Sequence, residues 1–347
     1  MTVAVTAPPR RRGRRVLWVF AATLLLLVSL GGVVLFAHRY DIREQRVEIR
    51  RDGHSLDGVL ATPSTGEGPF GLVVFVHGDG PIDATAETFY RPLWESFARA
   101  GYASLSWNKP GVAGSAGNWL DQTMGDRARE VTDALAWARR QPQIDTRRIG
   151  LWGSSQAGWV LPKVAADSPN LRFVIAVSPA INWLRQGRYH LLAELRAAGA
   201  DPAEVDRALR RREQTLALLR RGATVEEYRS TVEDAADMTA DRWRFIGRNY
   251  TVDASDDLRA LGPVPVLLLL AGHDHHVDVA ETEATYRRLL PAATLRVVHY
   301  PDADHRMVRY DLARSECRTT LTALFAPRAL FAEGYLADQR RFLRQHA

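Results

Sequence analysis

Cysteine and lysine are almost missing from this sequence of 347 residues, which has one cysteine and two lysines. With Cys317 alone, an internal disulfide and any metal site built from several thiolates are excluded. An isolated cysteine is most often a small core residue, so no catalytic thiol is expected. Because the two lysines are Lys109 and Lys163, arginine carries nearly all the positive charge. We attribute that bias to codon composition rather than to function.

Acidic residues are absent from the first 40 positions, which hold six of the 46 basic residues. The formal net charge of +6 therefore comes from the N-terminus, and the remaining 40 basic residues balance 40 acidic ones. A nucleic-acid-binding protein needs a basic surface to neutralise phosphates. Because the body of the chain has no basic excess, we expect no nucleic acid among its partners.

Charged residues are also missing from the 22 residues between Val16 and Ala37. At about 1.5 Å per residue this run can cross a bilayer core about 30 Å thick. A secretory signal peptide has a shorter apolar core and a small-residue cleavage site, which Leu35-Phe36-Ala37 does not supply. We expect a basic cytoplasmic head (1–15), an uncleaved transmembrane signal anchor (16–37) and an extracytoplasmic catalytic domain (41–347), because arginines remain in the cytoplasm. Cleavage would instead give a secreted protein.

The body of the chain alternates between strand-like and helix-like segments. Gly71 to Val76 is a continuous apolar run, typical of a strand that is covered on both faces of a parallel sheet. Short alternating segments at Arg46 to Arg50 and Asp57 to Ala61 precede it and predict a hairpin-like pair of edge strands. Further strands are expected at 102–107, 149–152, 173–177, 264–270 and 295–298. About eight strands that alternate with helices predict an α/β fold, with one mostly parallel eight-stranded sheet and helices on both faces.

Residues 182–261 interrupt this alternation, because they contain no convincing strand and several helix signals. Asp201-Pro202 forms an N-cap and first-position pair, and Thr224 with Glu227 forms a capping box. We interpret the segment as a helical cap inserted into the catalytic domain. Its aromatic residues either line an acyl pocket or, more simply, pack within the cap: Trp183, Tyr189, Tyr228, Trp243, Phe245 and Tyr250.

A candidate nucleophile follows the strand at 149–152. The spacing Gly153-x-Ser155-x-Ala157 is close to the G-x-S-x-G nucleophile elbow, with alanine at the last small position. The elbow needs small residues because the serine takes a strained backbone conformation while strand and helix pass closely. Ser154 is the rival nucleophile, but it stands at the variable position of the motif.

A serine hydroxyl needs a histidine to take its proton and usually a carboxylate to orient that histidine. Asp274 comes directly after the strand at 264–270, and His305 follows the strand at 295–298. The chain order serine, aspartate, histidine is that of α/β-hydrolase triads. Asp278 and Asp304 are rival acids, and Asp274 is preferred for its position at the end of a strand.

The acid loop contains three histidines near Asp274, which raises the alternative of a metal site. They are His273, His275 and His276. Imidazoles are common metal ligands, but neighbouring residues of one loop seldom converge on one ion. We therefore expect no metal.

Five segments of the body resemble motifs of the α/β-hydrolase superfamily, closest to bacterial esterases and dienelactone-hydrolase-like members. They are the turn His77-Gly78-Asp79-Gly80-Pro81, the loop Asn108–Ser115, the elbow Gly153–Gly158, the acid loop Gly272–Val277 and the base loop Asp302–His305. The resemblance covers nearly all of residues 45–347 and is weakest in the cap. It implies an oxyanion hole formed by the backbone N–H groups of Gln156 and Asp79. The Asp79 carboxylate would oppose the oxyanion, so we expect it to turn away.

The resemblance implies a serine hydrolase that needs no cofactor, with Ser155 as nucleophile, His305 as base and then acid, and Asp274 as the orienting acid. Carboxylic-ester hydrolysis of a small-molecule substrate is the expected reaction. A serine peptidase of the same fold is the alternative, because esters, thioesters and peptides all pass through the same tetrahedral intermediate. A catalytically inert, membrane-tethered binding protein is the third interpretation, since fold alone does not establish chemistry. The sequence leaves the oligomeric state open.

Overall fold

A single sheet organises this structure, a computed structural model that describes residues 12–51 and 54–346. The strands are β1 (Ile42–Arg51), β2 (His54–Pro63), β3 (Phe70–Val76), β4 (Tyr102–Trp107), β5 (Ile144–Ser154), β6 (Val174–Val177), β7 (Val266–His273) and β8 (Leu295–Asp304). They lie in the order β1-β2-β4-β3-β5-β6-β7-β8. β2 runs opposite to β1 and β4, and all other neighbours are parallel. The predicted eight-stranded, mostly parallel sheet is confirmed.

Successive side chains of the central strands point to opposite faces of the sheet, and both faces are buried. In β3, Leu72, Val74 and Val76 belong to one core cluster, whereas Val73 and Phe75 belong to the other. The period of two residues in a strand explains this division. A strand that is apolar at every position therefore needs helices on both sides.

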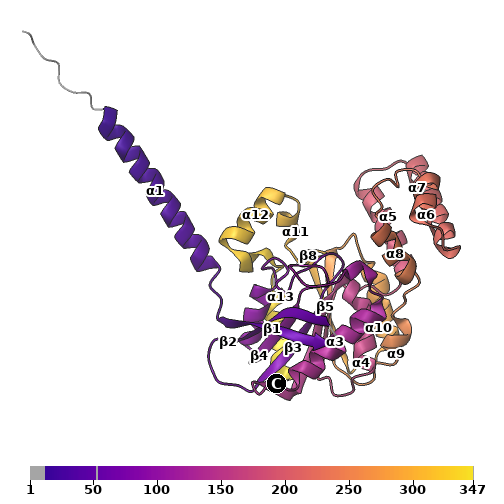
Figure 1. Cartoon of the computed structure of the whole chain (residues 1–347), viewed down its shortest axis with the longest axis horizontal. Helices are drawn as coiled ribbons and strands as arrows, with labels where there is room; N and C mark the ends of the chain where they lie inside the picture. Colours follow the sequence, from indigo (N-terminus) through magenta and orange to yellow (C-terminus); the bar gives the residue numbers. More distant parts are fainter. Residues whose placement is uncertain (1–11, 52–53, 347) are drawn as a thin grey trace, which may run out of the picture.

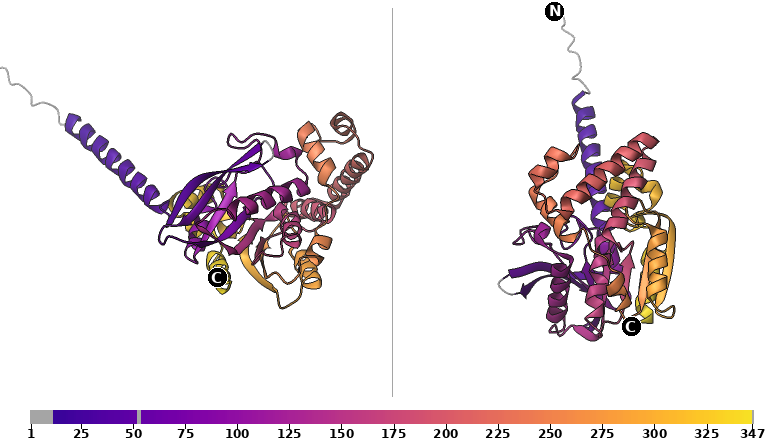
Figure 2. Two further views of the ribbon diagram at one scale, coloured as in Figure 1. Left: turned by 60° about the horizontal axis from the view of Figure 1, so that its bottom comes forward. Right: turned by 90° about the vertical axis from the view of Figure 1, so that its right-hand side faces the viewer.

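Helices supply this cover on both faces of the sheet. α3 (Met124–Ala138), α4 (Leu161–Ala166) and α10 (Val279–Leu289) pack on one face, and α2 (Arg91–Ala98) and α13 (Tyr335–Gln345) pack on the other. Figure 2 shows these two layers from the side. The connections place the carboxyl ends of β3, β5, β7 and β8 along one edge, where open α/β sheets bind their ligands.

Several strands are longer than the sequence indicated, among them β1, β2, β5 and β8. β5 begins at Ile144, five residues before the apolar stretch. The apolar pattern misses this first part because it carries the polar residues Asp145, Thr146, Arg147 and Arg148. β8 continues to Asp304 and stays paired with β7 as far as His273. Hydropathy marks the buried part of a strand and misses an end that reaches solvent.

The chain between β6 and β7 forms a helical cap that stands away from the sheet (Figure 1). Its helices are α5 (Trp183–Ala197), α6 (Pro202–Arg220), α7 (Val225–Thr231) and α8 (Ala240–Asn249). A bridge between Asn182 and Asp253 joins the two ends of this insertion. The cap has its own small core. The next helix, α9 (Ser255–Arg259), packs against α4 and α10 and so belongs to the main domain.

A long helix, α1 (Arg12–Ala37), projects from the body (Figure 1). Its stretch Trp18–Ala37 has a mean hydropathy of 2.6 and none of it is buried in the structure. By length and composition this helix can cross a membrane. The expected basic head lies partly outside the described residues.

Candidate active site

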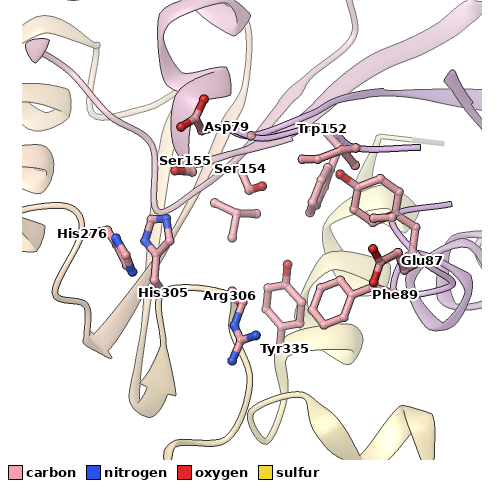
Figure 3. A pocket seen from close by; sticks show the side chains of 15 residues that line it. Asp79, Glu87, Phe89, Trp152, Ser154, Ser155, His276, His305, Arg306 and Tyr335 are labelled. Carbon is pink, nitrogen blue, oxygen red and sulfur yellow. The ribbon is translucent and has the colours of Figure 1, made fainter. Parts of the chain in front are cut away.

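A cavity of about 580 Å³ opens at the carboxyl edge of the sheet. Figure 3 shows Ser155 and His305 on one side of it, with Trp152 and Tyr335 on the opposite side. Its apolar and aromatic lining consists of Ile82, Ala86, Phe89, Tyr90, Trp152, Val177 and Tyr335. A volume in this range suits a small organic ligand.

Ser155 takes a left-handed backbone conformation, with φ of 56°, between the end of β5 and the 3₁₀ turn Ser155–Trp159. Such a conformation is costly for a residue with a side chain and is typical of a nucleophile elbow. Small neighbours make it possible, because a Cβ on Gly153 would lie only 2.6 Å from Cβ of Ala157. A Cβ on Gly158 would lie 2.3 Å from the carbonyl oxygen of Ala180. Alanine is therefore accommodated at position 157, but only glycine fits at 153 and 158.

Asp274 and His305 come from neighbouring strand ends and are hydrogen bonded to each other. Nδ1 of His305 donates to Oδ2 of Asp274 at 2.8 Å. The other carboxylate oxygen accepts backbone N–H groups from His276 and Val277 at 2.9 and 2.8 Å. Burial of Asp274 favours the protonated acid, but the His305 hydrogen bond and charge and the two N–H bonds outweigh it, so the pKa of this carboxyl is lowered. The carboxylate stays ionised and holds the imidazole with Nε2 toward the cavity.

The rival candidates have other roles in the structure. Ser154 lines the same cavity but ends β5 in extended conformation, with φ of −122°. Asp278 caps α10, where its side chain accepts the N–H of Glu281 at 3.0 Å. Asp304 accepts the N–H groups of its own loop and an arginine side chain. Ser154 thus lacks the left-handed backbone of Ser155, and the carboxylates of Asp278 and Asp304 are engaged in local backbone hydrogen bonds.

The three histidines of the acid loop point in different directions. His273 stacks on Tyr310 with ring centroids 3.5 Å apart, while His276 stacks on His190 at 4.7 Å. His275 lies 4.0 Å from Glu194. Among the described residues, no group of three or more His, Cys, Asp or Glu side chains converges on a possible ion.

Two buried cations hold the backbone of the turn that follows β3. Nζ of Lys109 donates to the carbonyls of Gly78 and Gly80 at 2.6 and 2.8 Å. Arg127 donates to the carbonyl of His77 and to the side-chain oxygen of Gln156, both at 2.5 Å. Burial and then the nearby arginine charge lower the pKa of Lys109. In a trans peptide the N–H points away from the carbonyl, so this clamp fixes the direction of the Asp79 N–H.

His77 positions the cavity wall and does not act as a base. Its Nε2 donates to the carbonyl of Trp107 at 2.5 Å, and the hydroxyl of Tyr90 donates to Nδ1 at 3.0 Å. Burial, followed by the charge of Lys109, lowers the pKa of His77 to about 3. The ring is therefore neutral at any ordinary pH and fixes the orientation of Tyr90.

Comparison with known proteins identifies the family. Residues 32–297 match the model of the S15 family, described as X-Pro dipeptidyl-peptidase. The chain belongs to this family. The match covers Ser155 and Asp274 and ends just before His305.

Individual relatives of this S15 protein are distant. The uncharacterized peptidase YuxL of Bacillus subtilis (strain 168) is 25% identical over 154 residues, which are 42% of this chain and 23% of that protein. The chain thus spans under a quarter of the YuxL sequence. The thiohydrolase apmlB of Arthrinium phaeospermum is 25% identical over 69% of this chain and 82% of that protein. The structure of the Pyrococcus furiosus esterase Pf2001 superposes with a TM-score of 0.57 and 17% identity, covering 88% and 91% of the two chains.

These comparisons and the sheet order establish the α/β-hydrolase fold. The predicted membership of the α/β-hydrolase superfamily is confirmed, and the S15 match makes the chain a serine hydrolase. At 17% identity the resemblance to the esterase structure concerns the fold and leaves the substrate undecided.

The Asp79 side chain of this S15 protein reaches the cap and meets an arginine there. Arg242 of α8 donates to both carboxylate oxygens, at 3.1 and 2.8 Å, and Gln156 donates to one of them at 2.9 Å. Burial opposes ionisation of Asp79, but the hydrogen bonds and charge of Arg242 outweigh it and lower the pKa of the carboxyl. This latch between Asp79 and Arg242 joins the cap to the turn after β3.

Replacing Arg242 with glutamine should loosen the cap, because the ion pair with Asp79 is lost. Half-exposed ion pairs contribute up to about 1 kcal/mol, so amide hydrogen exchange in α8 should accelerate by about three- to tenfold. Arg244→Gln is the matched control, because Arg244 pairs with Asp241 inside the same helix. Equal acceleration of exchange in the two variants would show that the latch does not hold the cap.

Several residues of the site carry no signal in the sequence. Phe89, Trp152 and Tyr335 lie far apart along the chain and meet only in the cavity wall. The six cap aromatics do not line this cavity, so the acyl-pocket interpretation of them was wrong. Tyr228 and Trp243 stack on each other within the cap, with ring centroids 4.4 Å apart. Trp183 and Phe245 instead pack against the core of the main domain.

Tyr189 is the cap aromatic that approaches the site. Its hydroxyl donates to the backbone carbonyl of Asp274 at 2.8 Å. The contact supports the acid loop from the cap side. Nothing in the helical pattern of α5 distinguishes this residue from its neighbours. The buried Lys109, in contrast, stood out as one of two lysines in a loop that resembles a family motif.

Proposed function

We propose that this protein is a carboxylic-ester hydrolase that works through an acyl-serine intermediate. The observation that carries the proposal is one arrangement: a left-handed Ser155 shares a cavity with His305, which is hydrogen bonded to the buried Asp274. A serine with a base and an orienting acid is the requirement for acyl transfer. The aromatic wall opposite Ser155 favours an acyl group over a polar one.

In the proposed mechanism Nε2 of His305 takes the proton of the Ser155 hydroxyl while Oγ attacks the ester carbonyl carbon. The tetrahedral intermediate collapses, its C–O bond breaks, and His305 returns the proton to the leaving alcohol. Water then repeats the steps against the acyl-serine and releases the acid. Asp274 stays ionised, accepts the Nδ1–H bond and stabilises the imidazolium. No cofactor takes part in these steps.

The backbone N–H groups of Gln156 and Asp79 are the proposed oxyanion donors. Gln156 directly follows Ser155 in the chain. Gly78 lies close to Ser155, since a Cβ placed on Gly78 would be 3.5 Å from Cβ of Ser155. Lys109 draws the Gly78 carbonyl away, and this supports an Asp79 N–H directed at the Ser155 side. Two fixed donors of this kind contribute several kcal/mol to transition-state stabilisation. The Asp79 charge is neutralised by Arg242, outside the oxyanion position.

We also propose that α1 anchors the protein as an uncleaved signal anchor, with the N-terminus in the cytoplasm and the catalytic domain outside. The support is the apolar surface of Trp18–Ala37, none of which is buried and which therefore favours apolar surroundings. The arginines that precede it favour this orientation.

Peptide hydrolysis is the second candidate, because the S15 family is described as X-Pro dipeptidyl-peptidase. A dipeptidyl-peptidase acts next to a free N-terminal amine. The cavity wall offers an exposed carboxylate, Glu87, that can pair with an ammonium group. The same three residues would serve either reaction.

Turnover by the full chain in detergent tests the two candidates. The esterase proposal expects hydrolysis of p-nitrophenyl butanoate and octanoate and no release of nitroaniline from Gly-Pro-p-nitroanilide. Hydrolysis of the anilide that is lost on N-acetylation of its glycine would establish the peptidase instead. If neither substrate reacts and an organophosphonate fails to label Ser155, the inert binding protein becomes the correct interpretation.

A further inference from the structure

Outside α1, two large hydrophobic side chains are exposed among the described residues, and both lie on one helix. They are Leu321 and Leu324 of α12 (Glu316–Phe325), with 50% and 42% of their surface accessible. Cys317 is also exposed on this helix. Positions 317, 321 and 324 are separated by four and three residues, so they share one face. An apolar helix face that contacts only water contributes nothing to stability.

The position of α12 suggests what its apolar face contacts. This helix lies beside the C-terminal end of α1, where α1 meets the main domain (Figures 1 and 2). His38, the first residue after the apolar stretch, has its Nε2 3.1 Å from the carbonyl oxygen of Leu324. The exposed leucines are thus level with the end of the candidate span. A bilayer around that span would reach them.

The relation between α1 and α12 is fixed by an arginine that follows α12. Arg328 donates to the carbonyls of Ala37 and Arg39 at 2.7 and 2.6 Å. It also forms an ion pair with the buried Glu95 of α2 at 2.6 Å. Glu95 in turn accepts the N–H of Asp41 at 3.1 Å. This network ties the end of the span to both α12 and the main domain.

The charge pattern of α12 agrees with contact to a membrane surface. Between Cys317 and Leu324 the charged residue is Arg318, which is engaged with Asp311 at 2.8 Å. The exposed positions along the apolar face are Cys317, Thr320, Leu321 and Leu324. A short face of this kind inserts between lipid headgroups without burying an unpaired charge.

We propose that α12 is a second membrane contact, in which Leu321 and Leu324 enter the lipid surface next to α1. The proposal rests on the membrane anchor proposed for α1. Two contacts, one spanning and one interfacial, hold the body in one orientation on the bilayer. Because α12 follows His305 closely in the chain, the carboxyl edge of the sheet and its cavity then lie on the membrane side.

The native Cys317 allows a direct test in the full chain. An environment-sensitive fluorophore is attached to Cys317, and the protein is reconstituted in phosphatidylcholine vesicles that contain lipids with a quencher on the acyl chain. Leu35→Cys and Asn170→Cys, each with Cys317→Ser, report on the span and on an exposed loop before β6. We expect lipid quenching at 317 comparable to that at 35 and none at 170.

The outcomes separate the contact from the anchor. Quenching at position 35 without quenching at 317 would overturn the α12 contact and leave the anchor standing. A lack of quenching at both would refute the anchor and the contact together. Protection of Cys317 from lipid quencher and from aqueous iodide would indicate a second protein copy on this face. In support, Leu321→Glu with Leu324→Glu should transfer the probe to iodide-accessible water while kcat/KM for a soluble ester stays unchanged.

Discussion

Replacing Ser155 with alanine should lower kcat/KM on a p-nitrophenyl ester by a factor on the order of 10⁴ to 10⁶. The reaction would lose its nucleophile, and the remaining oxyanion donors and binding contacts would accelerate only direct attack by water. KM should change little, because the cavity wall is untouched. Single-turnover and steady-state kinetics of the purified full chain measure both quantities.

Ser154→Ala is the matched control, since Ser154 lines the same cavity. Its extended backbone directs it differently from Ser155, so we expect kcat/KM within a few-fold of the wild type. Loss of activity in Ser154→Ala with retention in Ser155→Ala would reverse the assignment of the nucleophile. Equal and small effects in both variants would contradict the acyl-serine mechanism.

Replacing Asp274 with asparagine should reduce kcat by about 10³- to 10⁴-fold. The Asn amide can keep the N–H bonds from His276 and Val277 through its oxygen, but its NH₂ group would then face Nδ1 of His305. Nδ1 would become the acceptor and the proton would move to Nε2, which could no longer take the proton of Ser155. Because the buried site is preserved in shape, KM should remain similar, and the loss should appear in kcat.

Asp278→Asn and Asp304→Asn are the controls for this prediction, because both residues were rival acids. Asparagine remains a good helix N-cap, so α10 should keep its start and the enzyme its rate. A loss of kcat in Asp278→Asn as large as that in Asp274→Asn would contradict the assignment of the acid.

The free energy of unfolding that the ionised Asp274 contributes should depend on pH in a defined direction. The pKa of Asp274 is lowered in the folded state, so the ionised group stabilises the fold above the roughly 3.9 of an unfolded aspartate. This contribution is lost as the pH falls through the lower folded value. The difference in free energy of unfolding between wild type and Asp274→Asn should therefore be constant from about pH 5 upward and shrink below about pH 4. Urea unfolding at a series of pH values measures it.

The two buried cations near the turn after β3 show how the structure adds to the sequence. Lys109 was part of a loop that resembles a family motif, but its partners were not evident. The structure places its Nζ between the carbonyls of Gly78 and Gly80, and places Arg127 against His77 and Gln156. Such contacts depend on how two βα loops approach each other, and hydropathy carries no record of that approach.

The sequence alone determined the sheet, the order of the candidate site residues along the chain and the apolar helix. Fully apolar runs such as 71–76 require cover on both faces, and small residues at 153, 157 and 158 permit the left-handed Ser155. These are local requirements, so a local pattern expresses them. The carboxyl ends of parallel strands lie at one edge of a sheet, so the sequence predicted that Ser155, Asp274 and His305 lie close together.

Only the tertiary structure decided what surrounds that site. The cavity wall joins Phe89, Trp152 and Tyr335 from three distant segments, and Arg242 reaches Asp79 across 163 positions of the chain. The structure also places the exposed face of α12 next to the end of α1, because Leu324 lies beside His38. Contacts between distant segments depend on how helices and loops pack together, and neither periodicity nor motif spacing specifies that packing.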